Sequence, residues 1–393
     1  MNVLTDPGTS RRLVQQFIAS KACLPRLLAV LERLDILEAL PRGRVFTAAD
    51  VLERLQKRGM RAADPVQRTV IGSVVDLLEE IGWLVRLPES DSKDQGNGEP
   101  RFVLQPGNGN SAARWTPEEH RGLHQAFRGQ MAFFEEALES LEGLLWRGAR
   151  RFQFSLQDQE RWDQFLGNPE YQLGRWVTLR AMHLRDAPDV RLLDLCYGLG
   201  HSLAQIQDLY PRIRVAALDF TDVFRGCAMA KLRPEVRERI QWVNSHRWRA
   251  EGRCGFGVPL PFDDASFDGV LFACCDAYVA DAEREHLYRE IRRVLKPSGV
   301  LGVLTWGYPD AARQWIRNHA VRVHVYTHNI AGAVCENWSG FKPVAEMLRL
   351  FRRLGFRPHW TLQGAPFLLD GAVWVLQSTR HRASDGCHQE MPG

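Results

Sequence analysis

The sequence predicts an α/β fold with a mostly parallel sheet that follows a mainly helical region. Three observations support this prediction. The apolar stretch 192–195 runs into a turn that contains Gly198 and Gly200, and an apolar helix begins near Ser202. Strand-like and helix-like stretches then alternate through the second half of the chain, as they do in parallel sheets. Before residue 186, by contrast, the apolar residues mostly recur at helical spacing.

The strands of the expected sheet come in a regular order. After 192–195, we expect strands at 215–219 and 240–244, a fourth from the stretch 260–274, a fifth at 300–306, and a closing hairpin at 359–362 and 372–378. Asp219 ends the second strand, where a carboxylate can accept hydrogen bonds from both hydroxyls of a ribose. The glycine turn after the first strand can present backbone N–H groups to a nucleotide or nucleoside.

The N-terminal region predicts helices followed by two short strands. Residues 10–40 carry an apolar stripe at helical spacing. Thr47, with Asp50 three residues later, predicts a capped helix over 48–57. Asp64-Pro65 predicts the start of a further helix that ends at Gly82. Strands are expected at 83–87 and 101–104, and helices before a two-stranded sheet are typical of a winged helix.

A winged helix suggests DNA binding, but the charges argue against it. The helix after Asp64-Pro65 holds Arg68 against Asp76, Glu79 and Glu80. DNA phosphates would repel such a helix, so we expect no nucleic-acid partner. We interpret the region as a module for dimerisation and for shaping the substrate site. The stripe with Leu27, Leu31 and Leu34 offers more apolar surface than so small a domain needs, which predicts a homodimer.

Length and composition favour a soluble, two-domain protein. A chain of 393 residues exceeds one comfortable core, and its 45% hydrophobic and 25% charged content is ordinary. A net charge of +4 does not mark a nucleic-acid or membrane binder. The eight cysteines form no C-x-x-C pair, so we expect reduced thiols in the cytoplasm and no zinc site. No signal peptide or membrane-spanning stretch is expected.

Three further motifs support a specific resemblance. They are Leu260-Pro261-Phe262, Phe267-Asp268 and the run Arg293-Val294-Leu295-Lys296-Pro297-Ser298-Gly299. With the glycine turn, they resemble the class I S-adenosylmethionine (SAM)-dependent methyltransferases that carry "LPF…FD" and "RVLKPGG" signatures. The resemblance implies SAM as cofactor and a Rossmann-like sheet of seven strands. Natural-product and plant O-methyltransferases are similar in placing a winged-helix-like domain before the catalytic one.

These observations together predict four segments. Residues 1–115 form the winged-helix-like dimerisation domain, and 116–185 form a helical connector that covers the active site. Residues 186–379 form the SAM-binding methyltransferase domain, and 380–393 form a disordered tail.

The resemblance implies which residues bind the cofactor. Two of them depart from the family pattern: Cys196 stands where glycine is usual, and Asn244 replaces an aspartate. Because cysteine carries a Cβ, we expect an ordinary φ at Cys196. The complete set of expected cofactor-binding residues is Asp194, Cys196, Gly198, Gly200, Asp219, Phe220, Asn244, Ser245 and Cys274.

Acceptor-side residues are expected on segments around the strand ends. His328 is our first candidate for a general base and His324 the second, because a histidine can remove a proton near neutral pH. They lie four residues apart, so a helix would place both on one face. The alternative for each is a hydrogen-bonded structural histidine. Further acceptor-binding residues are expected to be Tyr171, Trp176, Asp276, Tyr278 and Trp306.

Three functions remain open at this point. The first is methylation of a small-molecule acceptor at O, N or C in secondary metabolism. The second is another use of SAM, such as an intramolecular cyclisation that gives a four-membered amino acid and methylthioadenosine. The third is a non-catalytic, SAM-binding regulatory protein. Cys196 and Asn244 keep the second possibility open.

Overall fold

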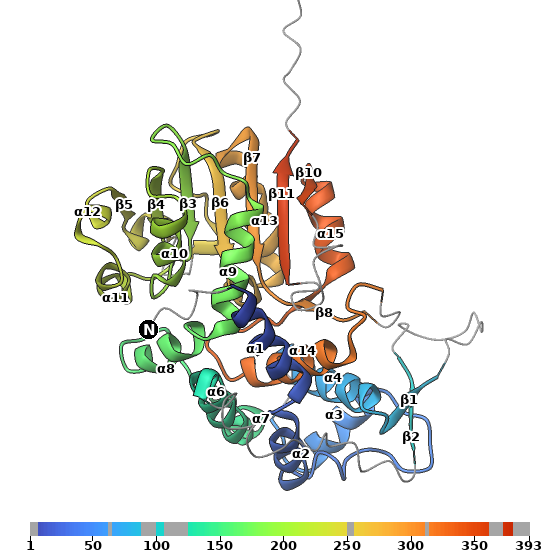
Figure 1. Cartoon of the computed structure of the whole chain (residues 1–393). Helices are drawn as coiled ribbons and strands as arrows, with labels where there is room; N and C mark the ends of the chain where they lie inside the picture. Colours follow the sequence, from blue (N-terminus) through green and yellow to red (C-terminus); the bar gives the residue numbers. More distant parts are fainter. Residues whose placement is uncertain are drawn as a thin grey trace, which may run out of the picture.

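A mixed sheet of seven strands forms the centre of the C-terminal half of the protein (Figure 1). The computed structural model describes residues 7–61, 65–87, 100–105, 125–249, 255–310, 314–360 and 372–379. The strand order across the sheet is β10 (Phe356–Trp360), β11 (Val373–Ser378), β7 (Leu295–Leu304), β6 (Phe267–Ala273), β3 (Arg191–Leu195), β4 (Arg214–Leu218), β5 (Ile240–Val243). Strands β3 to β7 are parallel, and the hairpin β10–β11 adds two antiparallel strands. The predicted seven-stranded α/β sheet is confirmed.

The order of the strands reverses at β3. This strand pairs with β4 on one side and with β6 on the other, so that Leu195 lies beside Leu218 and Phe272. Open α/β sheets bind ligands at such a switch point, beyond the carboxyl ends of the strands. The residues that directly follow these three strands therefore meet at one edge of the sheet.

Helices accompany the strands and also form the N-terminal region. Those interleaved with the sheet are α10 (His201–Leu209), α11 (Arg225–Ala230), α12 (Pro234–Arg237), α13 (Asp281–Val294), α14 (His319–Gly332) and α15 (Val344–Arg353). Those before the sheet are α1 (Pro7–Ser20), α2 (Leu24–Arg33), α3 (Ala48–Lys57), α4 (Pro65–Glu80), α6 (Arg128–Glu139), α7 (Leu141–Arg147), α8 (Gln159–Leu166) and α9 (Pro169–Ala181). Figure 1 shows the N-terminal helices gathered at one end of the sheet, with α14 among them.

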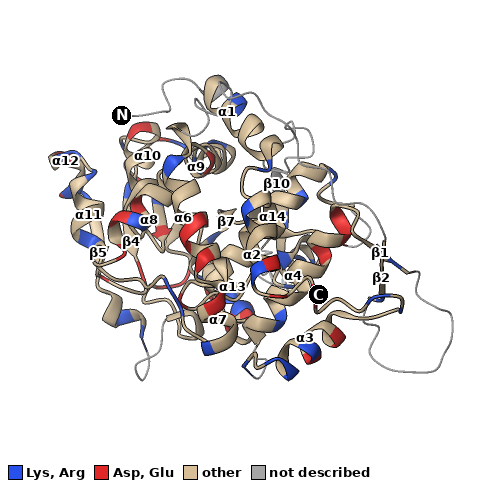
Figure 2. Cartoon of the chain, turned by 90° about the horizontal axis from the view of Figure 1, so that it is seen from below, with Lys and Arg blue, Asp and Glu red and all other residues tan. Residues whose placement is uncertain are grey.

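The predicted N-terminal elements form where the sequence signals them. Thr47 and Asp50 make a complete capping box at the start of α3. Pro65 begins α4. Strands β1 (Leu84–Arg86) and β2 (Phe102–Leu104) pair antiparallel, with Leu84 opposite Leu104. Helices before a two-stranded sheet are therefore present. Figure 2 shows residues of both charge signs on α3.

The leucine stripe with Leu27, Leu31 and Leu34 is not free apolar surface, contrary to the prediction. Leu27 and Leu31 are completely buried within the chain, and Leu34 is 7% exposed. Helix α2 packs against α6 and α14, so helices from later in the sequence cover the apolar stripe. Its apolar surface is part of this chain's own core. The sequence alone did not show that these distant helices would reach it.

Several predicted features lie outside the described residues. They are the first residues of the helical stretch that opens the connector at Thr116, residues 361–362 of the expected closing hairpin and the tail 380–393. The described part of that stretch consists of α6 and α7, which meet at Ser140. Among the described helices, none is both long and apolar enough to cross a membrane.

Candidate functional site

A cavity of about 640 Å³ lies at the carboxyl ends of β3, β4 and β6. We call it the strand-end cavity. Five of the residues predicted to bind the cofactor line it, namely Cys196, Gly198, Asp219, Phe220 and Cys274. Residues from α8 and the helices beside it close the cavity, among them Trp162, Leu166 and Arg175.

The turn after β3 is held in a left-handed conformation. Gly198 has φ +50° and Gly200 has φ +82°, and a Cβ on Gly200 would lie 2.6 Å from the Cα of Ala228. Only glycine fits at Gly200 without displacing backbone. The ordinary φ expected at Cys196 is wrong, because its φ is 64°. Cys196 donates its backbone N–H to the Leu218 oxygen at 2.7 Å, so the chain must turn directly after this last ladder bond.

Asp219 supplies the carboxylate of the strand-end cavity. It follows β4 directly and is 2% exposed. Its Oδ2 accepts the N–H of Gly198 at 2.7 Å, and its Oδ1 accepts that of Thr221 at 3.1 Å. Burial raises the pKa of this carboxyl to about 7, although these backbone donors favour the charged form. Asp219 and the glycine turn are thus joined as one unit.

Four residues predicted to bind the cofactor do not line this cavity. Gly200 shapes the turn from behind, and Asp194 is buried within β3, where burial raises its pKa well above the usual value. Asn244 accepts a hydrogen bond from Arg225 at 2.6 Å. Ser245 donates from its backbone N and its Oγ to Asp222. The chain after β5 is therefore used for local hydrogen bonds.

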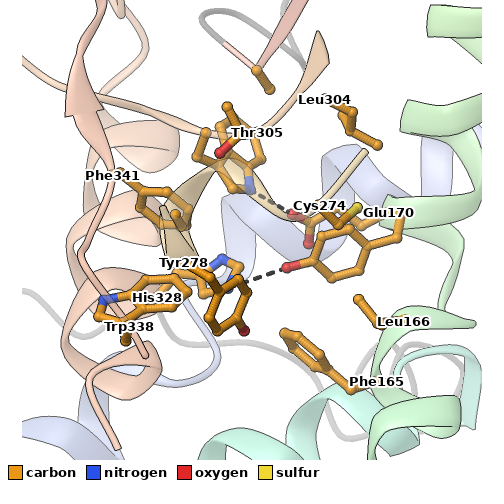
Figure 3. A pocket seen from close by; sticks show the side chains of 14 residues that line it. Phe165, Leu166, Glu170, Cys274, Tyr278, Leu304, Thr305, His328, Trp338 and Phe341 are labelled. Atoms are coloured by element: carbon orange, nitrogen blue, oxygen red, sulfur yellow. Dashed lines mark hydrogen bonds between the residues drawn. The ribbon is translucent and has the colours of Figure 1, made fainter. Parts of the chain in front are cut away.

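Figure 3 shows a second cavity, of about 510 Å³. We call it the aromatic cavity. Its aromatic walls are Phe165, Tyr171, Tyr278, Trp306, Trp338 and Phe341. Leu166, Cys274 and Tyr278 line both cavities, so the two share a wall. Of the predicted acceptor-side residues, Tyr171, Tyr278, Trp306 and His328 line this cavity.

A buried carboxylate, Glu170, forms the polar centre of the aromatic cavity. Its Oε1 accepts from Trp306 Nε1 at 3.0 Å and from His324 Nε2 at 3.1 Å, and its Oε2 accepts from Gln130 Nε2 at 2.7 Å. Burial alone would raise the pKa of Glu170, but the neighbouring His324 and His328 lower it to about 2. Glu170 is therefore ionised although it is only 2% exposed.

His328 and His324 lie on one face of α14, as predicted. His328 lines the aromatic cavity, and its Nε2 is 3.1 Å from the hydroxyl of Tyr171. Its Nδ1 is buried without a hydrogen-bond partner among the described residues. Burial, and then the charge of His324, lower the pKa of His328 to about 3, so this imidazole is neutral at pH 7. His324 lies behind the wall, with its ring 5.6 Å from that of Trp306.

Glu170, His324 and His328 also have the composition of a metal site. One donor atom from each lies within 4.8 Å of the others, a spacing that a metal ion could bridge. In this structure Glu170 and His324 hydrogen-bond to each other, and His328 bonds to Tyr171. These bonds already orient the three side chains. The sequence-based expectation that no metal is used stays a prediction.

Two predicted acceptor residues are placed elsewhere. Trp176 is half-buried on α9, which presents Tyr171 and Arg175 to the cavities instead. Asp276 is 1% exposed and pairs with Arg284 at 2.5 Å, while Tyr288 donates its hydroxyl to it at 2.6 Å. The turn after β6 points Asp276 toward α13 and Tyr278 toward the aromatic cavity. Asp276 lines neither cavity, and its carboxylate is occupied by Arg284 and Tyr288.

The sequence interpretation missed Glu170 and Arg175. Glu170 follows Asn168-Pro169, and the Asn168 side chain accepts the N–H groups of Glu170 and Tyr171. An acid in a capped first turn is so common that its site role was hidden. Arg175 is 3% exposed, lines the strand-end cavity and donates to the Leu166 oxygen at 2.9 Å. The sequence signal that could have identified Arg175 is that a charged residue lies on the buried face of a helix.

Comparisons with known sequences agree with this architecture. Residues 192–299 match the model of a family described as a methyltransferase domain. A demethylmenaquinone methyltransferase of Lactococcus lactis subsp. lactis (strain IL1403) is 27% identical over 155 residues, which is 39% of this chain and 55% of that protein. A sterol 24-C-methyltransferase of Gibberella zeae is 27% identical over 152 residues, 38% of this chain and 35% of that protein. The chain spans about half the length of the curated relatives it matches.

Solved structures are similar over nearly the whole chain. The CurJ carbon methyltransferase superposes with a TM-score of 0.56 at 14% identity, covering 95% of this chain and 100% of that one. The CMeT domain of the citrinin polyketide synthase gives 0.54 at 13%, covering 93% and 89%. An O-methyltransferase family 2 protein of Planctomyces limnophilus DSM 3776, solved with apigenin, gives 0.51 at 14%, covering 95% and 94%. At these identities the likeness concerns the fold. Residues 192–299 thus form a methyltransferase domain, and the chain has the fold of the class I SAM-dependent methyltransferases.

Proposed function

We propose that the protein transfers a methyl group from SAM to a small apolar acceptor, at a carbon or oxygen that first loses a proton. The observation that carries this proposal is the shared wall of Leu166, Cys274 and Tyr278 between the two cavities. One cavity holds a nucleoside cofactor, and the other holds the acceptor beside it. An intramolecular cyclase would need no second cavity of this kind.

The strand-end cavity fits SAM, which supplies an already activated methyl group on a sulfonium. Asp219 would accept hydrogen bonds from the ribose hydroxyls, because it lies at the end of the second parallel strand. The turn at Gly198 and Gly200 would lie against the amino-acid part. The buried Arg175 guanidinium would bind the carboxylate there, since it is the cation that lines this cavity near the turn.

His328 would take the proton of the acceptor. His328 Nε2 is 3.1 Å from the Tyr171 hydroxyl, and the proposal requires the tautomer in which Nε2 would donate to that hydroxyl and the unpartnered Nδ1 would accept a proton. Burial and His324 lower the pKa of His328 to about 3, so it is a weak base in the free protein, and the nearby Glu170 carboxylate would have to stabilise the imidazolium as it forms. His324 would act through Glu170, which it holds by the hydrogen bond from Nε2. His324 is thus a positioning residue in this proposal.

The walls of the aromatic cavity define the acceptor. Six aromatic rings favour a flat, apolar molecule, and the buried charge of Glu170 disfavours a carboxylate on it. An enolisable carbon acid or a phenol fits these conditions. The names of similar proteins point the same way, because they include carbon and O-methyltransferases. With a polyketide synthase domain among them, we propose a role in secondary metabolism in the cytoplasm.

Incubation with SAM separates the three possible functions. With a suitable acceptor, our proposal predicts S-adenosylhomocysteine and a product heavier by one methyl group. Methylthioadenosine formed without an acceptor would identify a cyclase. Binding of SAM with neither product, across a panel of enols, phenols and amines, would favour a regulatory protein. The predicted homodimer is tested separately, by sedimentation at micromolar concentration.

A further inference from the structure

Helix α14 connects the aromatic cavity to the N-terminal region. Every residue from Val321 to Gly332 is buried. One face of the helix carries His324 and His328 toward Glu170 and Tyr171. Another face packs against α4, which belongs to the N-terminal region in sequence (Figure 1). The position of the two histidines therefore depends on how α14 is held against α4.

Asn329, the residue after His328, joins three segments of the chain. It is 1% exposed. Its Nδ2 donates to Ser73 Oγ on α4 at 2.9 Å, and its Oδ1 accepts the N–H of Phe341 at 3.0 Å. Phe341 lines the aromatic cavity, and its ring meets that of His328 edge-on at 5.0 Å. A shift of Asn329 would thus move both a wall of the cavity and the proposed base.

Two further contacts hold α4 in place, one from strand β8 (Gly307–Tyr308) and one from α14. The hydroxyl of Tyr308 is 3.2 Å from Ser73 Oγ and 2.7 Å from Asp76 Oδ2. Arg322, seven residues before Asn329 and so on the same face of α14, makes two hydrogen bonds of 2.8 Å to Glu80. Asp76 and Glu80 are two of the acids that argue against DNA binding by α4. In the folded protein these acids hold α4 to the segments around the aromatic cavity.

We propose that Ser73 and Asn329 are positioning residues of the acceptor site. Helix α4 of the N-terminal region would thereby help to place the groups that act on the acceptor. Ser73 fixes Asn329, and Asn329 fixes the relative placement of His328 and Phe341. Neither side chain touches the acceptor. The kinetic part of this inference rests on the proposed function, whereas its structural part stands independently.

The test uses Ser73→Ala in the full chain labelled with ¹⁵N-histidine. The variant leaves the buried Asn329 Nδ2 without its acceptor, so we expect the ring resonances of His328 to shift while those of His201 stay in place. With an acceptor found by the methylation panel, kcat/KM should fall about tenfold or more. The Kd of S-adenosylhomocysteine should stay within about twofold of the parent. Ser73→Thr, which keeps the hydroxyl, should restore both the resonances and kcat/KM.

Thr47→Ala is the matched control. It also removes a hydroxyl hydrogen bond from the N-terminal region, the cap of α3, but far from α14 in the chain. It should lower Tm without changing the His328 resonances or kcat/KM. Tyr308→Phe provides a second probe, and should shift the same resonances less than Ser73→Ala. The proposal is overturned if Ser73→Ala and Tyr308→Phe leave His328 unmoved, or if Thr47→Ala has the same effects. If the His328 resonances shift but no acceptor in the panel is methylated, only the proposed function is rejected.

Discussion

The strand-end cavity and the aromatic cavity share a wall but are built by different means. The polar side of the first depends on the backbone, through the turn with positive φ at Cys196, Gly198 and Gly200 and the N–H groups that hold Asp219. The second is built from side chains that come from α8, α9, α14 and the segments after β6, β7 and α14. A turn after one strand can thus shape the strand-end cavity, whereas the aromatic cavity needs segments from the whole fold.

The largest expected effect concerns the aromatic cavity alone. His328→Ala should lower kcat by about 10²–10⁴-fold, the usual contribution of a positioned general base. The affinity for SAM should not change, because His328 does not line the strand-end cavity. Steady-state kinetics and calorimetry on the same sample measure the two effects. Normal turnover in both His328→Ala and His324→Ala would leave catalysis to positioning alone.

The next effect concerns the strand-end cavity alone. Asp219→Ala should weaken SAM binding by roughly 1.5–3 kcal/mol, because charged hydrogen bonds to the ribose are lost. Turnover at saturating SAM should be affected far less. Calorimetric titration with SAM checks the first part. An unchanged affinity would show that Asp219 serves only to hold the Gly198 turn.

A change of pH should affect the strand-end cavity through Asp219. Burial raises the pKa of Asp219 from 3.8 to about 7 in the folded protein without SAM. Protonation of this carboxyl therefore stabilises the folded state relative to the unfolded one. This contribution to stability is complete below about pH 4 and is lost as the pH rises through 7. SAM affinity moves the other way, since the ribose needs a charged acceptor, and should fall as the pH drops below 7. Titrations between about pH 5 and 8 test this, and a constant affinity would contradict it.

Removal of metal ions should have no effect. Glu170 and His324 bond to each other, and His328 bonds to Tyr171, so the polar groups of the aromatic cavity are oriented without an ion. Turnover after dialysis against EDTA should match that of the untreated protein. A loss of activity that cobalt or zinc restores would instead assign the three side chains to a metal.

The smallest effect concerns Cys196. A left-handed residue with a Cβ costs roughly 1–2 kcal/mol, so Cys196→Gly relieves strain in the folded turn. Glycine also makes the unfolded chain more flexible, which offsets part of that gain. We expect a free energy of unfolding within about 1 kcal/mol of the parent, measured by urea denaturation. A loss well above this value would mean that the thiol has a packing role that glycine cannot replace.

The difference between the cavities also explains what the sequence could predict. The strands, the turn and Asp219 follow from local patterns, and all are present. Glu170 was hidden because helix capping accounts for an acid at that position. Asp276 was misplaced because the direction of its side chain depends on Arg284 and Tyr288, which follow on α13. Leu27 is covered by helices from later in the sequence, and the spacing of apolar residues does not predict such tertiary packing.

Methyl transfer itself is the central claim, and a labelled methyl group tests it most directly. The protein is incubated with SAM that carries a trideuterated methyl group and with the panel of neutral enols and phenols, and products are identified by mass spectrometry. We expect one acceptor to gain the intact labelled methyl group in the parent protein. His328→Ala should still bind SAM but transfer far less label. Labelled methylthioadenosine in the absence of acceptor, or no transfer from a protein that binds SAM, would contradict the account.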